Sequence, residues 1–310
     1  MKAITFDTFG GPEVLTITDQ PDPLPETGEV LVQVAATTVN PTDLMMRNGA
    51  QAKMMEGLTP PYIAGMEFSG TIVDGGSSGL AVGTPVIGVL NPRTPKGGAY
   101  AEKILLPAAS VAAVSPDVDL VAAATVPMNA LTALLSLDFL DLSAGQTLLV
   151  TGGAGMLGGS AIQLAKAAGI TVLANVADKD ADMVKAFGAD HILPRNDFVD
   201  ELCAVAPEGV DGMIDGALIG NDVSHLVKDG GGAVSLRSTY KIEDKRLKVL
   251  NVSVLKGMED NGLMTRIADQ ISSGDLRPRV AETLSYTDAV KGHQMTEAGG
   301  LRGRVVLKFD

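Results

Sequence analysis

The sequence contains few residues from which disulfide bonds or metal sites are built. Cys203 is the only cysteine, and the three histidines, His191, His225 and His293, lie far apart along the chain. One cysteine excludes a disulfide within the chain and any metal site made of a cysteine cluster. The segment around Cys203, DELCAVA, is typical of one face of a helix, so we expect a buried, unreactive thiol. We do not expect the histidines to bind metal.

Positive charge and long apolar runs are also scarce. The chain has 24 Lys and Arg against 37 Asp and Glu, a net charge of −13 and a pI near 4.6, which argues against a nucleic-acid partner. No apolar run reaches the ~18 residues of a membrane span. The beginning, MKAITFDTFGGPEVL, lacks the extended apolar core of a signal peptide. We therefore expect a cytoplasmic globular protein without a membrane partner.

The most informative stretch is rich in glycine and runs from Thr147 to Asn175. Its first five residues, TLLVT, are typical of a buried strand. Apolar residues then recur at helical spacing as far as Gly169, and a second strand is predicted over Ile170–Val176. Between the first strand and the helix lie Gly153, Gly155 and Gly158, in GAGMLG. The pattern predicts a strand, a glycine turn, a helix and a second strand.

Such a turn suits the diphosphate of a dinucleotide. Glycine lets the chain leave the strand sharply, lets the anion approach the backbone, and lets the helix pack close to the sheet. The amides of Met156 and Leu157, at the start of the helix, would face the anion. The alternative is a tight turn that binds nothing.

The rest of the chain changes character on either side of this unit. Residues 1–122 contain short β-rich runs separated by Gly, Pro, Asp and Asn, which suggests a barrel or sandwich. Helical and strand patterns alternate after Asn175, as in a doubly wound parallel sheet. The predicted strands are Lys2–Phe6, Leu15–Thr18, Val30–Thr37, Gly70–Val73, Pro85–Val89, Tyr100–Leu106, His191–Leu193, Gly212–Asp215, Ala233–Leu236, Leu247–Leu255, Ala281–Ser285 and Arg304–Phe309. The predicted helices are Leu120–Ala124, Ala130–Leu137, Asp182–Phe187, Phe198–Ala206, Asp222–Val227, one from Leu263, and Tyr286–Ala298.

Motifs along nearly the whole chain resemble the zinc-free quinone oxidoreductase branch of the medium-chain dehydrogenase/reductases. They are MKAITFDTFGGPEVL, GEVLVQV, VNPTDLMMRNG, PPYIAGMEFSGTIV, GGAYAEKILLP, VPMNALTALLSL, GGAGMLGGSAIQLAKAAG, FGADHIL, GVDGMIDG and LRGRVVLKF. The resemblance implies an α/β protein with two domains. Residues 1–122 and 263–310 would form a catalytic domain with a GroES-like β-barrel. Residues 123–262 would form a Rossmann domain, whose doubly wound parallel sheet binds the cofactor.

Two positions depart from the zinc-dependent members of this superfamily. Where those members carry the cysteine and the histidine that bind zinc, this chain has Asn40 and Met66. An amide and a thioether are poor zinc ligands beside thiolate and imidazole. The resemblance therefore implies hydride transfer without a metal.

The same resemblance indicates the catalytic and substrate-binding residues. Asn40 would hydrogen-bond an acceptor oxygen, and Thr132 would lie against the nicotinamide. Met45 stands where many quinone reductases have a tyrosine, which suggests an adaptable apolar pocket lined by Met45, Met66 and Met128. The alternatives are a turn residue before Pro41, a threonine on a helix surface and ordinary core methionines.

The choice of cofactor depends on the tip of the second strand. NAD-specific sites have an acidic residue there, but the corresponding residue is the neutral Asn175. Asp178, three residues later, is better explained as a helix N-cap. Arg195 and Lys179 are candidates to contact a 2′-phosphate, although either could be an ordinary solvated charge. We therefore predict NADPH. The resemblance adds Leu218, Leu236 and Arg304 to the cofactor-binding residues.

We thus expect an NADPH-dependent reductase of quinones or α,β-unsaturated carbonyls. Reduction of an alkenal or enoyl-thioester double bond is the nearest alternative, and an NADPH-binding redox sensor without turnover is the alternative from another class. The resemblance also implies a homodimer, formed by edge pairing of the Leu247–Leu255 strands, because an uncovered apolar edge strand invites association.

Overall fold

Contacts divide the chain into two compact units. The computed structural model describes residues 1–236 and 240–309. The first unit contains Met1–Met128 and the chain from Leu255 on, and the second contains Asn129–Val254. From the sequence, we expected the chain to enter the second domain after residue 122 and to return to the first before residue 263.

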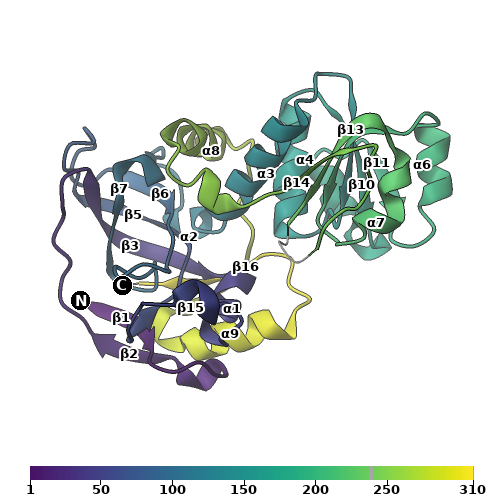
Figure 1. Cartoon of the computed structure of the whole chain (residues 1–310). Helices are drawn as coiled ribbons and strands as arrows, with labels where there is room; N and C mark the ends of the chain where they lie inside the picture. Colours follow the sequence, from purple (N-terminus) through teal and green to yellow (C-terminus); the bar gives the residue numbers. More distant parts are fainter. Residues whose placement is uncertain (237–239, 310) are drawn as a thin grey trace. The chain divides into compact units, whose positions relative to one another are not determined.

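The first unit contains two β-sheets (Figure 1). The larger has seven strands in the order β15-β16-β3-β5-β6-β8, with β7 also paired to β3, and the smaller has the order β2-β1-β4. The strands are β1 (Lys2–Phe6), β2 (Thr16–Asp19), β3 (Glu29–Val39), β4 (Tyr62–Ile63), β5 (Glu67–Asp74), β6 (Pro85–Val89), β7 (Lys103–Pro107), β8 (Val111–Ala113), β15 (Val280–Ser285) and β16 (Arg304–Lys308).

Strand β3 organises this unit because it pairs along both edges. One edge pairs with β5, whereas the other pairs first with β7 (Val32 opposite Ile104) and then with β16 (Thr37 opposite Leu307). Its β-branched sequence, EVLVQVAATTV, is buried at most positions, as expected for a strand covered on both faces. The last strand of the chain therefore belongs to the same sheet as the N-terminal region.

The helices of the first unit are short and have clear boundaries. They are α1 (Pro41–Arg47), α2 (Leu120–Ala123), α8 (Asn261–Ser273) and α9 (Ala289–Ala298). Asp260 caps α8 by accepting a hydrogen bond from the Leu263 amide, and Gly274 ends it in the left-handed conformation (φ 81°). Helix α3 (Pro127–Leu140) begins in this unit and continues into the second. Among the described residues, every helix is too short or too polar to cross a membrane.

The second unit is a six-stranded parallel sheet flanked by helices (Figure 1). Its strands follow the order β11-β10-β9-β12-β13-β14, so that the chain moves outward from β9 in one direction and then, from β12, in the other. This is the strand order of a Rossmann fold, with its switch point between β9 and β12. The predicted fold class is confirmed. The strands are β9 (Thr147–Thr151), β10 (Thr171–Val176), β11 (His191–Pro194), β12 (Val210–Asp215), β13 (Val227–Ser235) and β14 (Lys248–Asn251), and the helices are α4 (Met156–Ala167), α5 (Ala181–Ala186), α6 (Val199–Val205) and α7 (Gly220–Val223).

Several predicted elements have different boundaries in the structure. The strand expected over Leu247–Leu255 is only β14, and Val254–Lys256 forms a 3₁₀ turn. The strand expected from Tyr100 begins at Lys103, because the backbone of Tyr100 bonds to Ala64 and Ile4 instead of entering the β3 ladder. The helix expected over Asp222–Val227 is α7 followed by a 3₁₀ turn.

The expectation of a buried thiol at Cys203 is wrong. Cys203 is exposed on α6, while Phe198, Leu202 and Ala206, four residues apart, form the buried face. The apolar residues of DELCAVA fit a helix, but the buried face of that helix includes Leu202 and not the next residue, Cys203.

Candidate functional site

The glycine turn between β9 and α4 has the geometry that the motif predicts. Gly152 adopts a left-handed conformation (φ 67°), and the Gly153 amide donates to the carbonyl of Asn175, which ties the turn to β10. A Cβ atom on Gly158 would lie 2.4 Å from the Gly152 carbonyl oxygen, so a side chain there would push α4 off the turn. Gly155 is the N-cap and has no side-chain cap.

The turn therefore leaves the N-terminus of a twelve-residue helix uncapped by side chains, with Met156 and Leu157 in its first turn. Amides in that position have no partner within the helix and lie at the positive end of its dipole. Because backbone and dipole both favour an anion, and because glycine keeps the approach open, these residues fit the diphosphate of a dinucleotide.

A hydrogen-bonded clamp that we did not predict holds the neighbouring loop. Thr151, the last residue of β9, donates from Oγ1 to Asp215 Oδ1 (2.6 Å) and accepts from the Ala217 amide (3.1 Å). The carboxylate of Asp215, at the end of β12, also accepts from the amides of Ile219 (3.1 Å) and Gly220 (2.7 Å). The two loops at the switch point are therefore fixed to each other.

This clamp accounts for the backbone of Leu218. It is a non-glycine residue in the left-handed region (φ 61°), which costs roughly 1–2 kcal/mol. The amides of Ile219 and Gly220, which follow Leu218, donate hydrogen bonds to Asp215 and hold the loop in that shape. Such strain is typical of loops that contact a ligand. Leu236, the other leucine in our prediction, directly follows β13 and is partly buried.

The tips of β10 and β11 bring Asn175 next to the chain that carries Arg195. Asn175 pairs with Leu193, and its Nδ2 donates to the carbonyls of Pro194 (2.7 Å) and Arg195 (3.4 Å). Arg195 and Lys179 are both exposed and follow the carboxyl ends of adjacent strands. Asn175 therefore anchors the backbone of Arg195 at the edge where the glycine turn lies.

The expectation that Asp178 caps a helix is wrong. A 3₁₀ turn begins at Asp178 itself, its N-cap is Ala177, and it has no side-chain cap. Asp180 then takes the N-cap position of α5, also without a side-chain cap. Asp178 is exposed beside Lys179, so no capping bond accounts for it.

In the first unit, the predicted catalytic residue Asn40 belongs to a buried polar cluster centred on Glu67. Glu67 Oε1 accepts from Thr38 Oγ1 (2.6 Å) and Asn40 Nδ2 (2.9 Å), and Oε2 accepts from the amide of Met128 (2.8 Å). Thr38, Asn40 and Glu67 are completely buried. We did not predict the role of Glu67, although it follows Met66 in the segment compared with the zinc-dependent enzymes.

The amide of Asn40 is only partly used by this cluster. Its Nδ2 also donates to Thr38 Oγ1 (2.9 Å), which lies closer to Glu67 Oε1 than to Nδ2. An amide nitrogen has two N–H donors, and Nδ2 has two acceptors here, Glu67 Oε1 and Thr38 Oγ1. Asn40 Oδ1 is buried without a hydrogen-bond partner among the described residues. The carbonyl oxygen of Asn40 is thus the atom of this amide that the cluster leaves unused.

The residues present do not fit a catalytic zinc. At the two positions compared with zinc ligands, Asn40 is engaged with Glu67, and Met66 offers a thioether in a buried position. Over residues 1–236 and 240–309, no three His, Cys, Asp or Glu side chains are grouped so that they could hold a metal ion.

A second buried carboxyl, that of Asp43, lies at the start of α1. Its Oδ2 accepts from the Asn40 amide (2.8 Å) and its Oδ1 from the Gly65 amide (3.0 Å). Burial raises the pKa of Asp43 to about 7, against the opposing effect of these two hydrogen bonds, and the charge of Glu67 adds to the rise. Burial also lowers the pKa of Arg304, while Glu67 and Asp43 oppose that shift.

Arg304, which we expected to contact the cofactor, is thus a desolvated cation near two carboxylates. Its Nε is buried without a hydrogen-bond partner in the described part of the chain. Arg279 lies near it, and the pKa of Arg279 falls to about 10 because of burial first and then the charges of Arg304 and Arg302. This concentration of positive charge suits an anion.

The remaining predicted residues occupy different environments. Met66 and Met128 are buried, whereas the side chain of Met45 is 42 % exposed on α1. Thr132 is half-buried on α3, and its carbonyl accepts from Ser136 Oγ (2.7 Å). Met66 and Met128 therefore have the burial of core residues, and Met45 does not.

His293 has a structural role that no sequence pattern indicated. It is completely buried on α9 between Arg47 Nη1 (3.1 Å from Nδ1) and the Tyr100 hydroxyl (3.0 Å from Nε2). Burial, and then the charge of Arg47, lowers the pKa of His293 to about 3, so the ring is neutral at pH 7. Because Arg47 donates to Nδ1, the proton of the neutral ring is on Nε2. The network joins α1 to α9.

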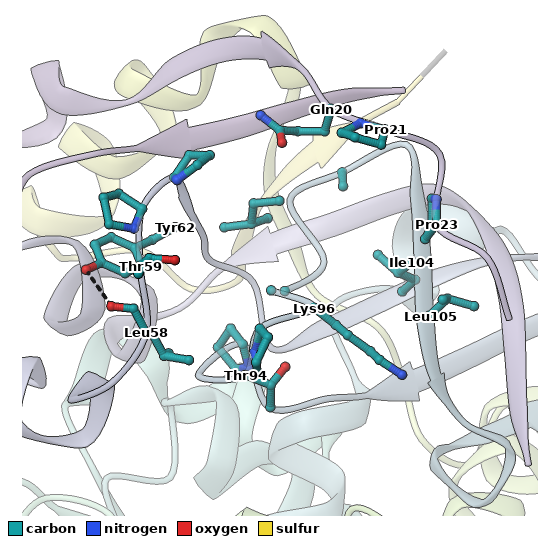
Figure 2. A pocket seen from close by; sticks show the side chains of 18 of the residues that line it. Gln20, Pro21, Pro23, Leu58, Thr59, Tyr62, Thr94, Lys96, Ile104 and Leu105 are labelled. Carbon is teal, nitrogen blue, oxygen red and sulfur yellow. Dashed lines mark hydrogen bonds between the residues drawn. The ribbon is translucent and has the colours of Figure 1, made fainter. Parts of the chain in front are cut away.

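A pocket of about 420 Å³ lies elsewhere in the first unit. Figure 2 shows Gln20, Pro21 and Pro23 across it from Leu58, Thr59 and Tyr62, whose hydroxyl donates to the Leu58 carbonyl (3.3 Å). Residues 57–60, Pro92 and residues 94–98 form part of its lining. Neither Asn40 nor any of the three predicted pocket methionines does so.

Two stretches of the chain match known protein families. Residues 26–116 match the family described as "Alcohol dehydrogenase GroES-like domain", and residues 187–307 match the one described as "Zinc-binding dehydrogenase".

Individual relatives are similar along most of their length. A quinone oxidoreductase from Lama guanicoe is 28 % identical, with 99 % of this chain and 97 % of that protein covered. An NADPH-dependent alkenal/one oxidoreductase from Arabidopsis thaliana is also 28 % identical, over 93 % of this chain and 76 % of that protein. The solved structure of the quinone oxidoreductase from Coxiella burnetii has a TM-score of 0.87 and 28 % identity, and covers 100 % of this chain and 99 % of its own.

The raised pKa of Asp43 predicts a specific dependence of stability on pH. Since its folded pKa, about 7, exceeds the ordinary 3.8, the folded state holds this proton more tightly. The resulting stabilisation is complete at low pH and is lost as pH rises through this window, by up to about 1.4 kcal/mol per pH unit. In Asp43→Asn this contribution is absent. We expect the unfolding free energy of Asp43→Asn, relative to the unsubstituted protein, to increase between about pH 4.5 and pH 6.5.

Denaturant titrations of both proteins at several pH values measure this difference. His293 acts in the opposite direction, because its lowered pKa removes stability as pH falls, but both proteins contain it and its effect cancels. Parallel curves for the two proteins would show that Asp43 does not titrate in this range.

Proposed function

This chain belongs to the quinone oxidoreductase branch of the medium-chain dehydrogenase/reductase superfamily, and we propose that it transfers a hydride from NADPH to a quinone or an α,β-unsaturated carbonyl without zinc. The observation that carries this proposal is the open glycine turn at the switch point of the parallel sheet, fixed by the clamp between Thr151 and Asp215. The names of the relatives support oxidoreductase activity towards quinones and alkenals.

In this proposal, the second unit holds the cofactor. Gly153, Gly155 and Gly158 keep the approach to the helix open, and the amides of Met156 and Leu157 bind the diphosphate. Leu218 and Leu236, in the loops after β12 and β13, contact the dinucleotide. Bound NADPH supplies the hydride. Arg304 and Thr132 complete the set of cofactor contacts.

The preference for NADPH rests on charge at the tips of β10 and β11. Asn175 offers no carboxylate to bind a ribose 2′-hydroxyl, and its amide is committed to the backbone of Pro194 and Arg195. The exposed cations Arg195 and Lys179 are placed to pair with a 2′-phosphate. The exposed Asp178 beside them is the group that would favour NADH instead.

Asn40 supplies the hydrogen bonds to the acceptor. Its side-chain amide would hydrogen-bond the oxygen of a quinone or enone, with Nδ2 shared between that oxygen and its present acceptors, and the proton that completes reduction comes from water or a weak acid. Because the residues present do not form a zinc site, the rate would come from holding the acceptor close to the nicotinamide, without a Lewis acid. Met45, Met66 and Met128 form the apolar side of the acceptor site.

We also propose a homodimer in which β14 pairs with its copy in a second chain. Strand β14 is at the edge of the six-stranded sheet and is short and partly exposed. Edge pairing across a two-fold axis satisfies its free backbone groups.

An assay of NADPH oxidation over a panel of quinones, alkenals and enoyl thioesters tests the function. We expect turnover with quinones or alkenals by protein dialysed against a weak chelator, and no gain on adding zinc. Tight NADPH binding without reduction of any acceptor would favour a redox sensor instead. If only enoyl thioesters are reduced, the protein is instead a double-bond reductase of those substrates.

Replacement of Arg195 by Ala tests the cofactor preference. A charge-assisted bond to phosphate contributes roughly 1.5–3 kcal/mol, so KM for NADPH should rise about 10- to 150-fold while KM for NADH stays nearly unchanged. Lys245→Ala is the matched control, since Lys245 is exposed but precedes β14, at the opposite edge of the parallel sheet. If both KM values of Arg195→Ala move together, the assignment is wrong.

Light scattering of an edge variant tests the dimer. The unsubstituted protein should have twice the mass of one chain at micromolar concentration. Val249→Asp, which places a charge on β14, should be a monomer, whereas Val205→Asp, an equally exposed valine on α6, should remain a dimer. A monomeric unsubstituted protein would contradict the proposal.

A further inference from the structure

We propose that Glu67 is a positioning residue that fixes the side-chain amide of Asn40 in the orientation used for substrate. This inference rests on the proposed function, because it concerns how Asn40 meets an acceptor. It is carried by three hydrogen bonds to one buried carboxylate, from Thr38, Asn40 and the backbone of Met128.

The direction of each hydrogen bond determines which way the Asn40 amide faces. A carboxylate only accepts, so Thr38 Oγ1, 2.6 Å from Glu67 Oε1, uses its single proton there. Thr38 Oγ1 can then only accept from Asn40. Both neighbours of the Asn40 side chain are therefore acceptors, and Nδ2 must face them. The opposite orientation would place Oδ1 against two acceptors.

Burial makes this arrangement strict. Thr38, Asn40 and Glu67 are all completely buried, so water cannot replace a lost partner without a rearrangement. The second carboxylate oxygen is held by the Met128 amide at the start of α3, which stops the carboxylate from rotating away. The outcome is a single orientation, in which Nδ2 faces Thr38 and Glu67 and Oδ1 faces away without a partner among the described residues.

The other side of Asn40 is fixed independently of Glu67. Asn40 precedes α1, and its backbone amide donates to Asp43 Oδ2 (2.8 Å). The backbone of Asn40 is therefore held by Asp43 and its side chain by Thr38 and Glu67. Removing the carboxylate of Glu67 should free the amide to rotate while leaving its backbone in place.

Two variants test this at different points of the cluster. Glu67→Gln replaces one acceptor oxygen by a donor, and Thr38→Val removes the hydroxyl while leaving the bond to Met128 untouched. Each should lower kcat for the preferred acceptor by up to ~100-fold, the effect of a small misplacement of a reacting partner, with little change in KM for NADPH. Thr38→Ser should restore the activity that Thr38→Val loses.

A double-mutant cycle separates positioning from general structural support. If Glu67 acts through Asn40, then Glu67→Gln should cause no further loss of kcat once Asn40 is Ala. Glu102→Gln is the matched control, because Glu102 also accepts a backbone hydrogen bond in the same unit, from Lys2 (2.6 Å), and should leave kcat unchanged. Equal losses in the presence and absence of Asn40 would overturn the proposal.

A readout without turnover keeps this test separate from that of the function. With asparagine labelled by ¹⁵N, the side-chain amide signal of Asn40 is the one missing from Asn40→Ala. Its protons should exchange slowly with solvent in the unsubstituted protein, and about tenfold faster or more in Glu67→Gln and Thr38→Val. The control, Glu102→Gln, should unfold at the same midpoint as the unsubstituted protein. Unchanged exchange in both variants would overturn the proposal. A protein that oxidises no NADPH at all would reject the function, while the exchange rates would still decide the role of Glu67.

Discussion

The carboxylate of Glu67 is completely buried and must satisfy its hydrogen bonds within the protein. It does so by joining two regions that are far apart in the sequence, the end of β3 with the adjacent start of α1, and the start of α3. Strand β3 in turn pairs with β5, which carries Glu67, and with the last strand, β16. The surroundings of Asn40 thus depend on one acidic side chain that the central sheet holds in place.

The second unit combines a close backbone approach with a buried carboxylate. Its glycine turn brings α4 so close to the backbone of Gly152 and Gly153 that Gly158 has no room for a side chain. Asp215 then fixes the neighbouring loop, including the left-handed Leu218. Both units thus use a buried carboxylate to hold neighbouring segments in place. In each unit, hydrogen bonds to the carboxylate fix the surrounding backbone. The groups proposed to contact ligands are those left exposed or without a hydrogen-bond partner.

Local patterns were enough to predict much of the fold. The glycine motif, the alternation of helix and strand, and the β-rich N-terminal region all depend on neighbours in the chain, and their types were correct. The buried face of α6, the helix cap at Asp178 and the length of β14 were predicted wrongly, because tertiary context can override local sequence preference. The Glu67 cluster and the contact of His293 with Arg47 were missed for the same reason: their partners are 27 to 246 residues apart.

The central claim is that this chain positions an acceptor to receive a hydride from NADPH, and the fate of that hydride tests it most directly. NADPH carrying deuterium at both hydrogen positions of nicotinamide C4 can be incubated with the protein and a quinone or enone, and the product examined by mass spectrometry. For an enone, where the hydride ends on carbon, the account predicts one deuterium per product molecule. A product without deuterium, or NADPH that remains bound and unchanged with every acceptor, would contradict it.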